Sequence, residues 1–504
     1  MTVDDLIAAI SPAWAARRAA ARAHLAGLTR LYDAVSSSTY RPRRGASASA
    51  DMAMDTAQAR LREYARWLDD NHDLAVGVLD DLVANIIGSG VGVEPMALDA
   101  GGAPVERVNT QLSTLWDEFW AAPEVTGELP GPELERLLCR SWLRDGEVFL
   151  QHVTAPAVTR NSALGYLVAP LEADFVPFDL IDPDARTVHG VIKDGLGRPI
   201  GYHVYRQHPG NLGTIASLRG TTLETVVVAA SNMSHLKFAR RLHQTRGASL
   251  LHAVFTRLDD LKDYEESERI AARVAAAFTG YIRKAEGFAA SSNAATGDRQ
   301  MEMAPGMIFD NLLPGEDVGT IDPKRPNNEV GDYIAIQERR IAAGTGSRYS
   351  AISKNYNGTY SAQRQELVEG RVHYQRLFSY LAHRLYLPVW QHFVDAALLG
   401  GRLRVGVAVE PASLYRPQLR APSLPWIDPL KEIQAHALAV ENGFRARAQV
   451  VRDLGGDPRE VDALLAADTL DVRPGGESSP PDTHAAEAAD DDQPDDDQPE
   501  EAAA

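Results

Sequence analysis

Apolar side chains recur at helical spacing along most of the chain. Two apolar rows at four-residue intervals in residues 73–87 predict a well-buried helix with Asp73 as its N-cap. An aromatic face ending at Trp120 predicts a second core helix. The longest pattern begins after Gly247 and predicts a helix to about Lys284, about 37 residues or roughly 55 Å. Such a helix must pack along neighbours in its own chain or in other subunits.

Between residues 145 and 229 the pattern changes to short apolar runs separated by turn residues. Asp145-Gly146 is a turn dipeptide that ends a helix at 134–143. The runs predict strands at 147–153, 166–168, 201–206 and 225–229. The glycine cluster at 88–92 follows a helix, whereas nucleotide-binding glycine loops follow a strand and open a helix. That cluster is therefore interpreted as a helix end that leads into a strand.

Helical spacing dominates the second half of the chain. A helix at 333–343 is expected to stop at Gly344, and residues 347–360 form a polar loop. The next helix starts at Ser361, and Pro388 within its pattern predicts a kink or break. Three further helices are predicted between residues 426 and 467, with Gly443 and Gly455-Gly456 at their ends and Asp457-Pro458 as the last N-cap.

Charge is distributed unevenly along the 504 residues. The net charge is −18, and residues 474–504 hold eleven acidic side chains with no Lys or Arg, so the remainder carries about −7. The tail is expected to be disordered. The one strongly basic block is 41–44, in a low-complexity linker, which argues against tight phosphate binding. The single cysteine, Cys139, excludes an internal disulfide framework.

Signatures of catalysis are absent from the sequence. It contains no phosphate-binding Gly-x-x-x-x-Gly-Lys-Ser/Thr loop, no His-Glu-x-x-His, no Gly-x-Ser-x-Gly and no Cys-x-x-Cys. The fourteen histidines lack metal-ligand spacing. We therefore expect no enzyme activity, no cofactor and no metal. An enzyme such as a nuclease, built from scattered carboxylates, stays open as an alternative.

Several motifs occur in a fixed order. Two Pro-Gly turns and a Pro-Lys-Arg-Pro segment precede a helix with Arg339-Arg340 and the polar aromatic loop Asn355-Tyr356-Asn357-Gly358-Thr359-Tyr360. Earlier in the chain come an Asp-Gly-Glu turn at 145–147 and a Gln-x-Arg-Gly turn at 244–247. Over roughly residues 50–468 this order closely resembles the lambda-type portal proteins of tailed bacteriophages.

The resemblance implies a mainly helical α+β portal fold that assembles as a ring, usually of twelve copies. It has a wing, a stem of long helices, a clip and a helical crown. The implied borders are a flexible N-terminal arm at 1–50, wing at 51–246, stem helix at 247–285, clip at 286–330, second stem helix at 331–345, tunnel loop at 346–360, tunnel helix and return to the wing at 361–425, crown at 426–468 and disordered acidic tail at 469–504.

The resemblance also implies a function. Portals form the channel at one capsid vertex through which terminase packages DNA and through which DNA is later ejected. The implied partners are other copies of the chain, the terminase large subunit, capsid and scaffold proteins, head-completion proteins and double-stranded DNA, with no membrane. The location would be the virion, after assembly in the host cytoplasm. A portal of a prophage remnant or gene-transfer agent remains an alternative. The residues expected to meet DNA are Arg348, Lys354, Asn355, Tyr356 and Asn357.

Overall fold

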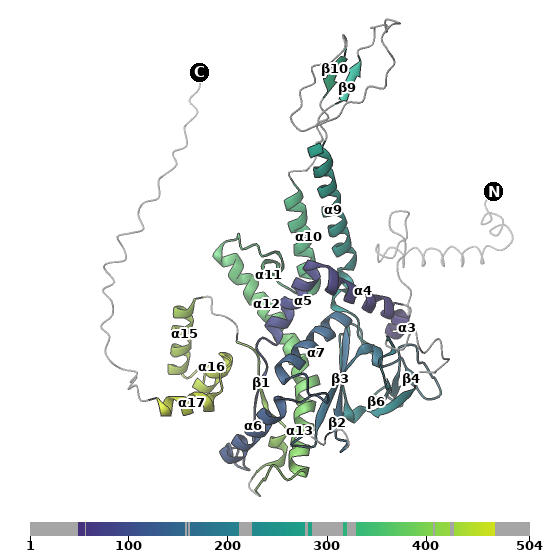
Figure 1. Ribbon diagram of the computed structural model, residues 1–504. Coiled ribbons are helices and arrows are strands. Elements are labelled where there is room, and N and C mark those ends of the chain that lie inside the picture. The colour runs from purple at the N-terminus through teal and green to yellow at the C-terminus, as the bar shows by residue number, and fades with distance from the viewer. Residues whose placement is uncertain are drawn as a thin grey trace, which may run out of the picture. The chain divides into compact units, whose positions relative to one another are not determined.

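The computed structural model describes residues 49–55, 57–156, 159, 162–210, 224–277, 281–284, 316–319, 329–406, 409–423 and 428–468. The chain divides into two compact units, the first ending at Pro422 and the second beginning at Ser423 (Figure 1). The expected arm up to residue 48, most of the expected clip, the Pro-Gly motifs between 305 and 326, and the tail from residue 469 lie outside the described residues.

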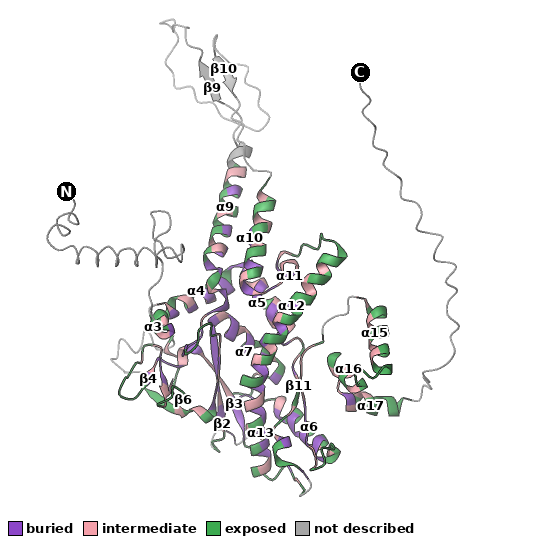
Figure 2. Ribbon diagram, turned by 180° about the vertical axis from the view of Figure 1, so that it is seen from behind, coloured by how far each residue is buried: buried purple, intermediate pink, exposed green. Residues whose placement is uncertain are grey.

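The core of the first unit is built by helices from both halves of the chain. Figure 2 shows buried residues concentrated in α4, α5, α7 and the central strands. The N-terminal helices are α3 (Ala50–Asp55), α4 (Gln58–Asn71), α5 (Asp73–Ile86), α6 (Glu106–Trp120) and α7 (Gly131–Asp145). Both predicted apolar rows of α5 contribute buried side chains, and Leu79, Leu82 and Ile86 are fully buried. The predicted aromatic face is also confirmed, since Trp116 stacks on Trp120 and meets Phe393 edge-on.

The predicted N-cap of α5 is wrong by one residue. His72 is the N-cap, and Asp73 is the first helical residue. One residue separates α4 from α5, and it adopts the extended backbone that a cap needs, with φ −126° and ψ 113°. The His72 Nε2 donates a hydrogen bond to the Leu258 carbonyl at 3.1 Å, which fixes this buried residue between the helices.

Two antiparallel sheets follow the helices. The central one has the order β3-β2-β8, and the outer one has the order β4-β5-β6-β7. Their strands are β2 (Glu147–Val153), β3 (Leu167–Glu172), β4 (Thr187–Val188), β5 (Val191–Lys193), β6 (Pro199–Tyr205), β7 (Thr225–Ala229) and β8 (Met233–Lys237). A separate pair joins β1 (Gly92–Glu94) to β11 (Gln418–Arg420). The strands predicted at 147–153, 201–206 and 225–229 are confirmed within one or two residues.

The helix predicted after Gly247 is shorter than its apolar pattern. A 3₁₀ turn, η5 (Leu250–Ala253), comes first, and α9 spans 23 residues, Phe255–Ala277. Residues Tyr281–Lys284 form β9 instead, paired antiparallel with β10 (Glu316–Gly319). The Ser249 hydroxyl accepts a hydrogen bond from the Leu251 amide and begins the separate first turn. The strand partner lies more than thirty positions away, so local spacing could not indicate it.

The second half of the first unit is almost entirely helical. Its helices are α10 (Val330–Thr345), α11 (Tyr349–Ser353), α12 (Tyr360–Leu381), the π-helical segment η6 (Ala382–Tyr386), α13 (Leu387–Leu399) and α14 (Pro411–Leu414). Pro388 does not break the helix, because the π segment just before it widens the turn into which the proline ring fits.

Gly344 does not end α10, contrary to the prediction. The helix continues to Thr345, and Gly346 caps it with φ 79°. Gly344 instead permits close packing, because a Cβ there would lie 2.6 Å from Val254 Cγ1. Gly344 therefore allows the close packing, and Gly346 ends the helix.

The second unit contains α15 (Pro429–Glu441), α16 (Arg447–Asp453) and α17 (Pro458–Ala467). Its predicted ends are confirmed, since Gly443 and Gly455 have positive φ and the Asp457 carboxylate accepts from the Arg459 amide at 2.9 Å. Among its described residues only Pro458 is buried. No helix in the described part of the chain is both long and apolar enough to cross a membrane.

Candidate nucleic-acid interface

The loop between α10 and α12 is anchored by a carboxylate on α5. Asp81 accepts hydrogen bonds from the Ser347 hydroxyl at 2.6 Å, the Arg348 Nη2 at 2.9 Å and the Tyr374 hydroxyl at 2.9 Å. The Asp81 side chain is only 5% exposed. Burial, with the Asp81 charge beside it, raises the pKa of Tyr374, so this hydroxyl stays protonated and donates. These three donors hold the start of the loop against the core.

The next residues extend this anchor. Residues 349–353 form α11, whose Ala351 and Ile352 are buried. The Ser350 amide donates to Glu366 Oε1 on α12 at 3.0 Å. The segment expected as a polar loop therefore begins with a short packed helix, because Ile352 and Ala351 can reach the core once Arg348 is fixed.

The remainder of the loop is an exposed tip, defined as residues 354–360. Every residue in it is exposed, and Tyr356 and Tyr360 are 61% and 56% exposed. Lys354 adopts a left-handed backbone with φ 53°, which turns the chain away from α11. The Asn355 side-chain oxygen accepts from the Asn357 amide at 3.0 Å, and Thr359 caps α12 by accepting from Ala362. An ordered turn thus joins two fixed helices.

The five residues that the sequence analysis proposed as DNA contacts fall into two groups in the structure. Lys354, Asn355, Tyr356 and Asn357 lie together on the tip. Arg348 belongs to the anchor instead, because its guanidinium donates to Asp81 and to the Tyr374 hydroxyl at 3.1 Å. Within residues 346–360, all of which the structure describes, this leaves Lys354 as the charged side chain on the exposed tip.

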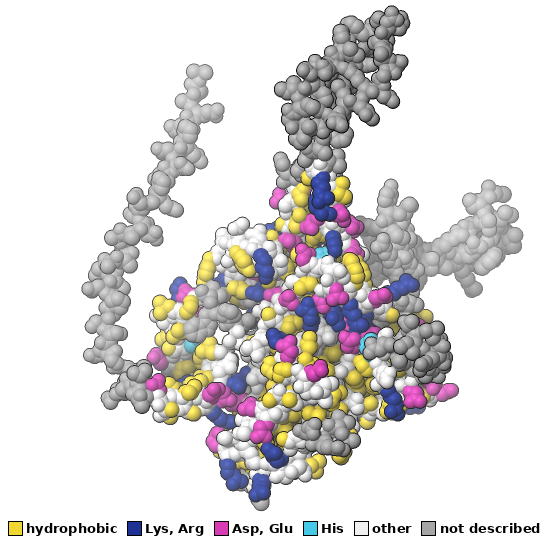
Figure 3. All heavy atoms as spheres, in the orientation of Figure 1, with side chains coloured by type: hydrophobic (Ala, Val, Ile, Leu, Met, Phe, Trp, Pro, Cys, Tyr) yellow, Lys and Arg dark blue, Asp and Glu magenta, His cyan; other side chains and the backbone are white. Residues whose placement is uncertain are grey.

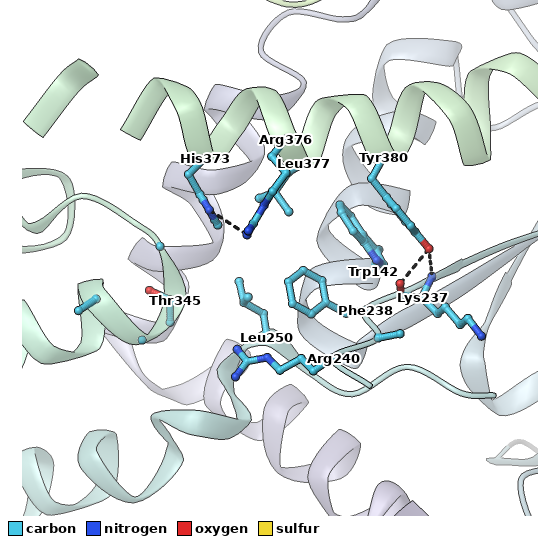
Figure 4. Close-up of a pocket in the computed structure, with 14 residues that line it drawn as sticks. Trp142, Lys237, Phe238, Arg240, Leu250, Thr345, His373, Arg376, Leu377 and Tyr380 are labelled. Carbon is cyan, nitrogen blue, oxygen red and sulfur yellow. Dashed lines mark hydrogen bonds between the residues drawn. The ribbon is translucent and has the colours of Figure 1, made fainter. Parts of the chain in front are cut away.

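A cavity of about 560 Å³ lies beside the anchor, between α12, the end of α10 and the segment after β8 (Figure 4). Its charged or ionisable lining comprises Lys237, Arg240, His373, Arg376 and Tyr380. Arg376 donates to His373 Nδ1 at 3.2 Å, and burial together with Arg376 lowers the pKa of His373. No carboxylate or cysteine lines the cavity, whereas the Thr345 hydroxyl and the His373 imidazole do.

The two turns singled out in the sequence interlock in the core. Arg246 is fully buried and donates its Nε to Glu147 Oε1 at 2.8 Å. Its other nitrogens donate to three backbone carbonyls, those of Ala173, Val176 and His189. Burial alone would raise the pKa of Glu147, but Arg246 and His235 hold it well below its usual value. The turns also need their glycines, since a Cβ on Gly247 would lie 1.9 Å from the Gly146 carbonyl oxygen.

One cluster has the composition of a cation site. Glu172, Asp174 and His208 place ligand atoms within 4.8 Å of one another. Arginines already neutralise its carboxylates, because Arg66 lies 2.6 Å from Asp174 and 3.5 Å from Glu172, and Arg62 lies 3.0 Å from Asp174. We therefore interpret the cluster as an ion-pair network between α4 and the central sheet.

The surface shows no concentrated basic field on the face drawn in Figure 3. Lys and Arg side chains are interspersed there with Asp and Glu, and hydrophobic side chains lie between them. Such a surface can meet DNA without the dense phosphate neutralisation that makes binding tight. The signal that sequence analysis missed was Asp81, a carboxylate embedded in the apolar pattern of α5.

Comparison with known proteins confirms the resemblance. The family described as "Phage portal protein, lambda family" matches residues 37–377. A probable portal protein of Halomonas phage phiHAP-1 is 26% identical over 446 residues, covering 84% of this chain and 83% of that protein. Portal protein B of Escherichia phage lambda is 22% identical over 344 residues, which are 64% of this chain and 58% of that protein.

Solved structures of gene transfer agent particles are also similar. A chain in the neck of a native particle, computed with C12 symmetry, is 14% identical with a TM-score of 0.46, covering 80% of this chain and 94% of that chain. A chain in the native virion gives 15% identity, a TM-score of 0.44 and coverage of 82% and 96%.

The family match spans more than half of the sequence, and the mainly helical α+β fold agrees with it. The chain therefore belongs to the lambda family of phage portal proteins. Roles in genome packaging and ejection follow from membership of this family, which is a structural class rather than an enzymatic one.

Proposed function

We propose that the chain forms a closed ring of about a dozen copies at one capsid vertex. DNA would enter through it under the terminase motor and leave through it at ejection, and head-completion proteins would attach to its outer end. Family membership supports this proposal. It applies equally to the portal of a phage, a prophage remnant or a gene transfer agent. Assembly in the host cytoplasm and contacts with capsid and scaffold proteins belong to the same proposal.

The proposed regions correspond to elements of the fold. The wing at 51–246 contains α3 to α7 and both sheets, and α9 and α10 form the stem. The antiparallel pair of β9 and β10 belongs to the stem end and the clip, and α12 is the tunnel helix. The crown at 426–468 corresponds to the three helices of the second unit.

The tip at 354–360 is proposed to touch DNA at the narrowest part of the channel. The observation that supports this role is an exposed polar turn held at both ends by packed helices, through Asp81 on one side and the α12 cap on the other. Lys354 and the asparagine amides can donate to phosphate oxygens, and Tyr356 offers an exposed ring. A single cation per copy is too weak to trap DNA.

The test has two stages. Mass measurement of the purified chain at micromolar concentration should give rings of about twelve subunits, and a stable monomer would refute the ring. The variant Lys354→Ala with Asn355→Ala should form the same rings but lower the packaging or retention of full-length DNA. Arg198→Ala is the control, because Arg198 is exposed in the turn before β6 and its ion-pair partner among the described residues is Asp194. Normal packaging and retention in the double variant would refute DNA contact by the tip.

A further inference from the structure

The first half of α12 exposes a face on which arginine and valine alternate. Val368, Arg371 and Val372 follow Arg364 by four, seven and eight residues, so all four lie within about 100° of one another around the helix. All four are exposed, with Val368 at 51% and Val372 at 66%. Neither arginine has an ion-pair partner among the residues that the structure describes. This set is called the α12 face.

The composition of the α12 face indicates a protein partner. The opposite side of the helix is already packed, because Gly370, Tyr374 and Leu377 are buried. Two exposed valines contribute nothing to a helix surface that contacts only water or phosphate groups. A helical partner would bury the valines, while opposite charges would pair with the flanking arginines.

The stem helix α9 exposes a face of opposite charge. Asp260, Asp263 and Ile270 lie on one side of it at spacings of three and seven residues, and all are exposed. Ile270 is 49% exposed, and neither aspartate has an ion-pair partner in the described part of the chain. The nearby cations are engaged elsewhere, with Lys262 over the Trp67 ring and Arg269 paired to Glu266. This set is called the α9 face.

The helices α9 and α12 lie on either side of α10. In both views α10 lies between them, with α9 on one side and α12 on the other (Figures 1 and 2). One copy cannot bring its own two faces together in this arrangement. Two different patches on separate helices of one molecule are what a head-to-tail contact requires, and such contacts form rings when the rotation between copies closes.

We propose that the α12 face of one copy docks on the α9 face of the next copy in the ring. Arg364 and Arg371 would pair with Asp260 and Asp263, and the valines would cover Ile270. The inference rests on the proposed ring and names a surface that builds it. Because the charges are exposed at the rim of the contact, its strength falls as salt concentration rises.

Charge reversal tests the pairing. Arg364→Glu with Arg371→Glu should raise the protein concentration needed for half-maximal ring formation at least tenfold, and Asp260→Lys with Asp263→Lys should do the same. Combining the four substitutions should restore the concentration for half-maximal ring formation to within about threefold of the wild-type value. Ring formation by the combined variant would also show that each double variant fails to assemble because of charge repulsion and not because it misfolds. Arg198→Glu with Arg206→Glu makes the same charge change on the outer sheet and should leave assembly unchanged.

Mass photometry over a dilution series gives the readout, with a 30-base-pair duplex added in parallel. Rings that persist unchanged in both reversed sets would overturn the inference while leaving the ring standing. Loss of duplex binding without any change in assembly would also overturn it, by assigning the α12 face to DNA. A wild-type chain that forms no ring would refute the proposed function itself and this inference with it.

Discussion

Replacing Asp81 by alanine should release the base of the loop between α10 and α12. The substitution removes the acceptor for Ser347, Arg348 and Tyr374 and leaves the Arg348 guanidinium without its carboxylate. Hydrogen bonds to a charged group contribute about 1.5–3 kcal/mol each, and they are not additive. Because the Arg348 side chain is 20% exposed, water compensates part of the loss. We therefore expect about 3 kcal/mol of local destabilisation.

Hydrogen exchange measures this local opening directly. The amides of Ala351 and Ile352 both donate to the Arg348 carbonyl at 3.2 Å, so they exchange only when the base of the loop opens. Since 1.4 kcal/mol corresponds to a factor of ten, the opening equilibrium should rise about a hundredfold. A peptide spanning 348–353 should therefore exchange about a hundred times faster in the variant.

A neighbouring residue provides the control. Asp80 precedes Asp81 on α5, but its side chain is 62% exposed and pairs with Arg140 at the surface. Asp80→Ala should therefore change exchange in 348–353 by less than about threefold. Peptides from α13, on the far side of the core, should stay protected in both variants. An Asp81→Ala protein whose loop exchanges within threefold of wild type would refute the role of Asp81 as the anchor.

Three further outcomes are expected. Arg246→Met should lower the free energy of unfolding by about 4 kcal/mol, because it removes the closest cationic partner of the buried Glu147 carboxylate, whereas Arg198→Met should leave thermal unfolding unchanged. Burial raises the pKa of Glu135 to about 7, so the native state keeps a proton that the unfolded state has released. Stability should therefore fall by about 3 kcal/mol as pH rises from about 4.5 to 7, and Glu135→Gln should flatten this slope in thermal unfolding at several pH values. Deleting residues 474–504 should leave rings and unfolding temperature unchanged, and loss of soluble rings would contradict that.

Elements defined by local periodicity were predictable from the sequence. The two apolar rows of α5, the aromatic face of α6 and the turn before β2 each depend on residues close in the chain. The helix predicted at 247–285 exists as α9, but its predicted end was wrong because Tyr281–Lys284 pairs with β10, a distant segment. Hydrophobic spacing cannot distinguish a continuing helix from a strand whose partner lies elsewhere.

The candidate site was predictable in composition but not in contacts. The sequence indicated a polar segment between two helices, and the tip at 354–360 is indeed exposed. It could not indicate that Arg348 pairs with Asp81, because the two residues are 267 positions apart. A carboxylate inside an apolar helix pattern does signal a buried partner, although it does not identify that partner.

The anchored base and the exposed tip together suit weak contact with a moving polymer. An exposed ion pair contributes about 0–1 kcal/mol, so a tip with Lys354 as its cation releases a phosphate readily. A ring of about a dozen copies would surround the duplex with about a dozen such tips, and affinity rises with the number engaged at once. Restraining the base matters because a loosened loop could bend towards the duplex and engage more donors per copy. By this argument Asp81, whose side chain is buried beneath the loop, would limit how tightly the proposed channel holds DNA.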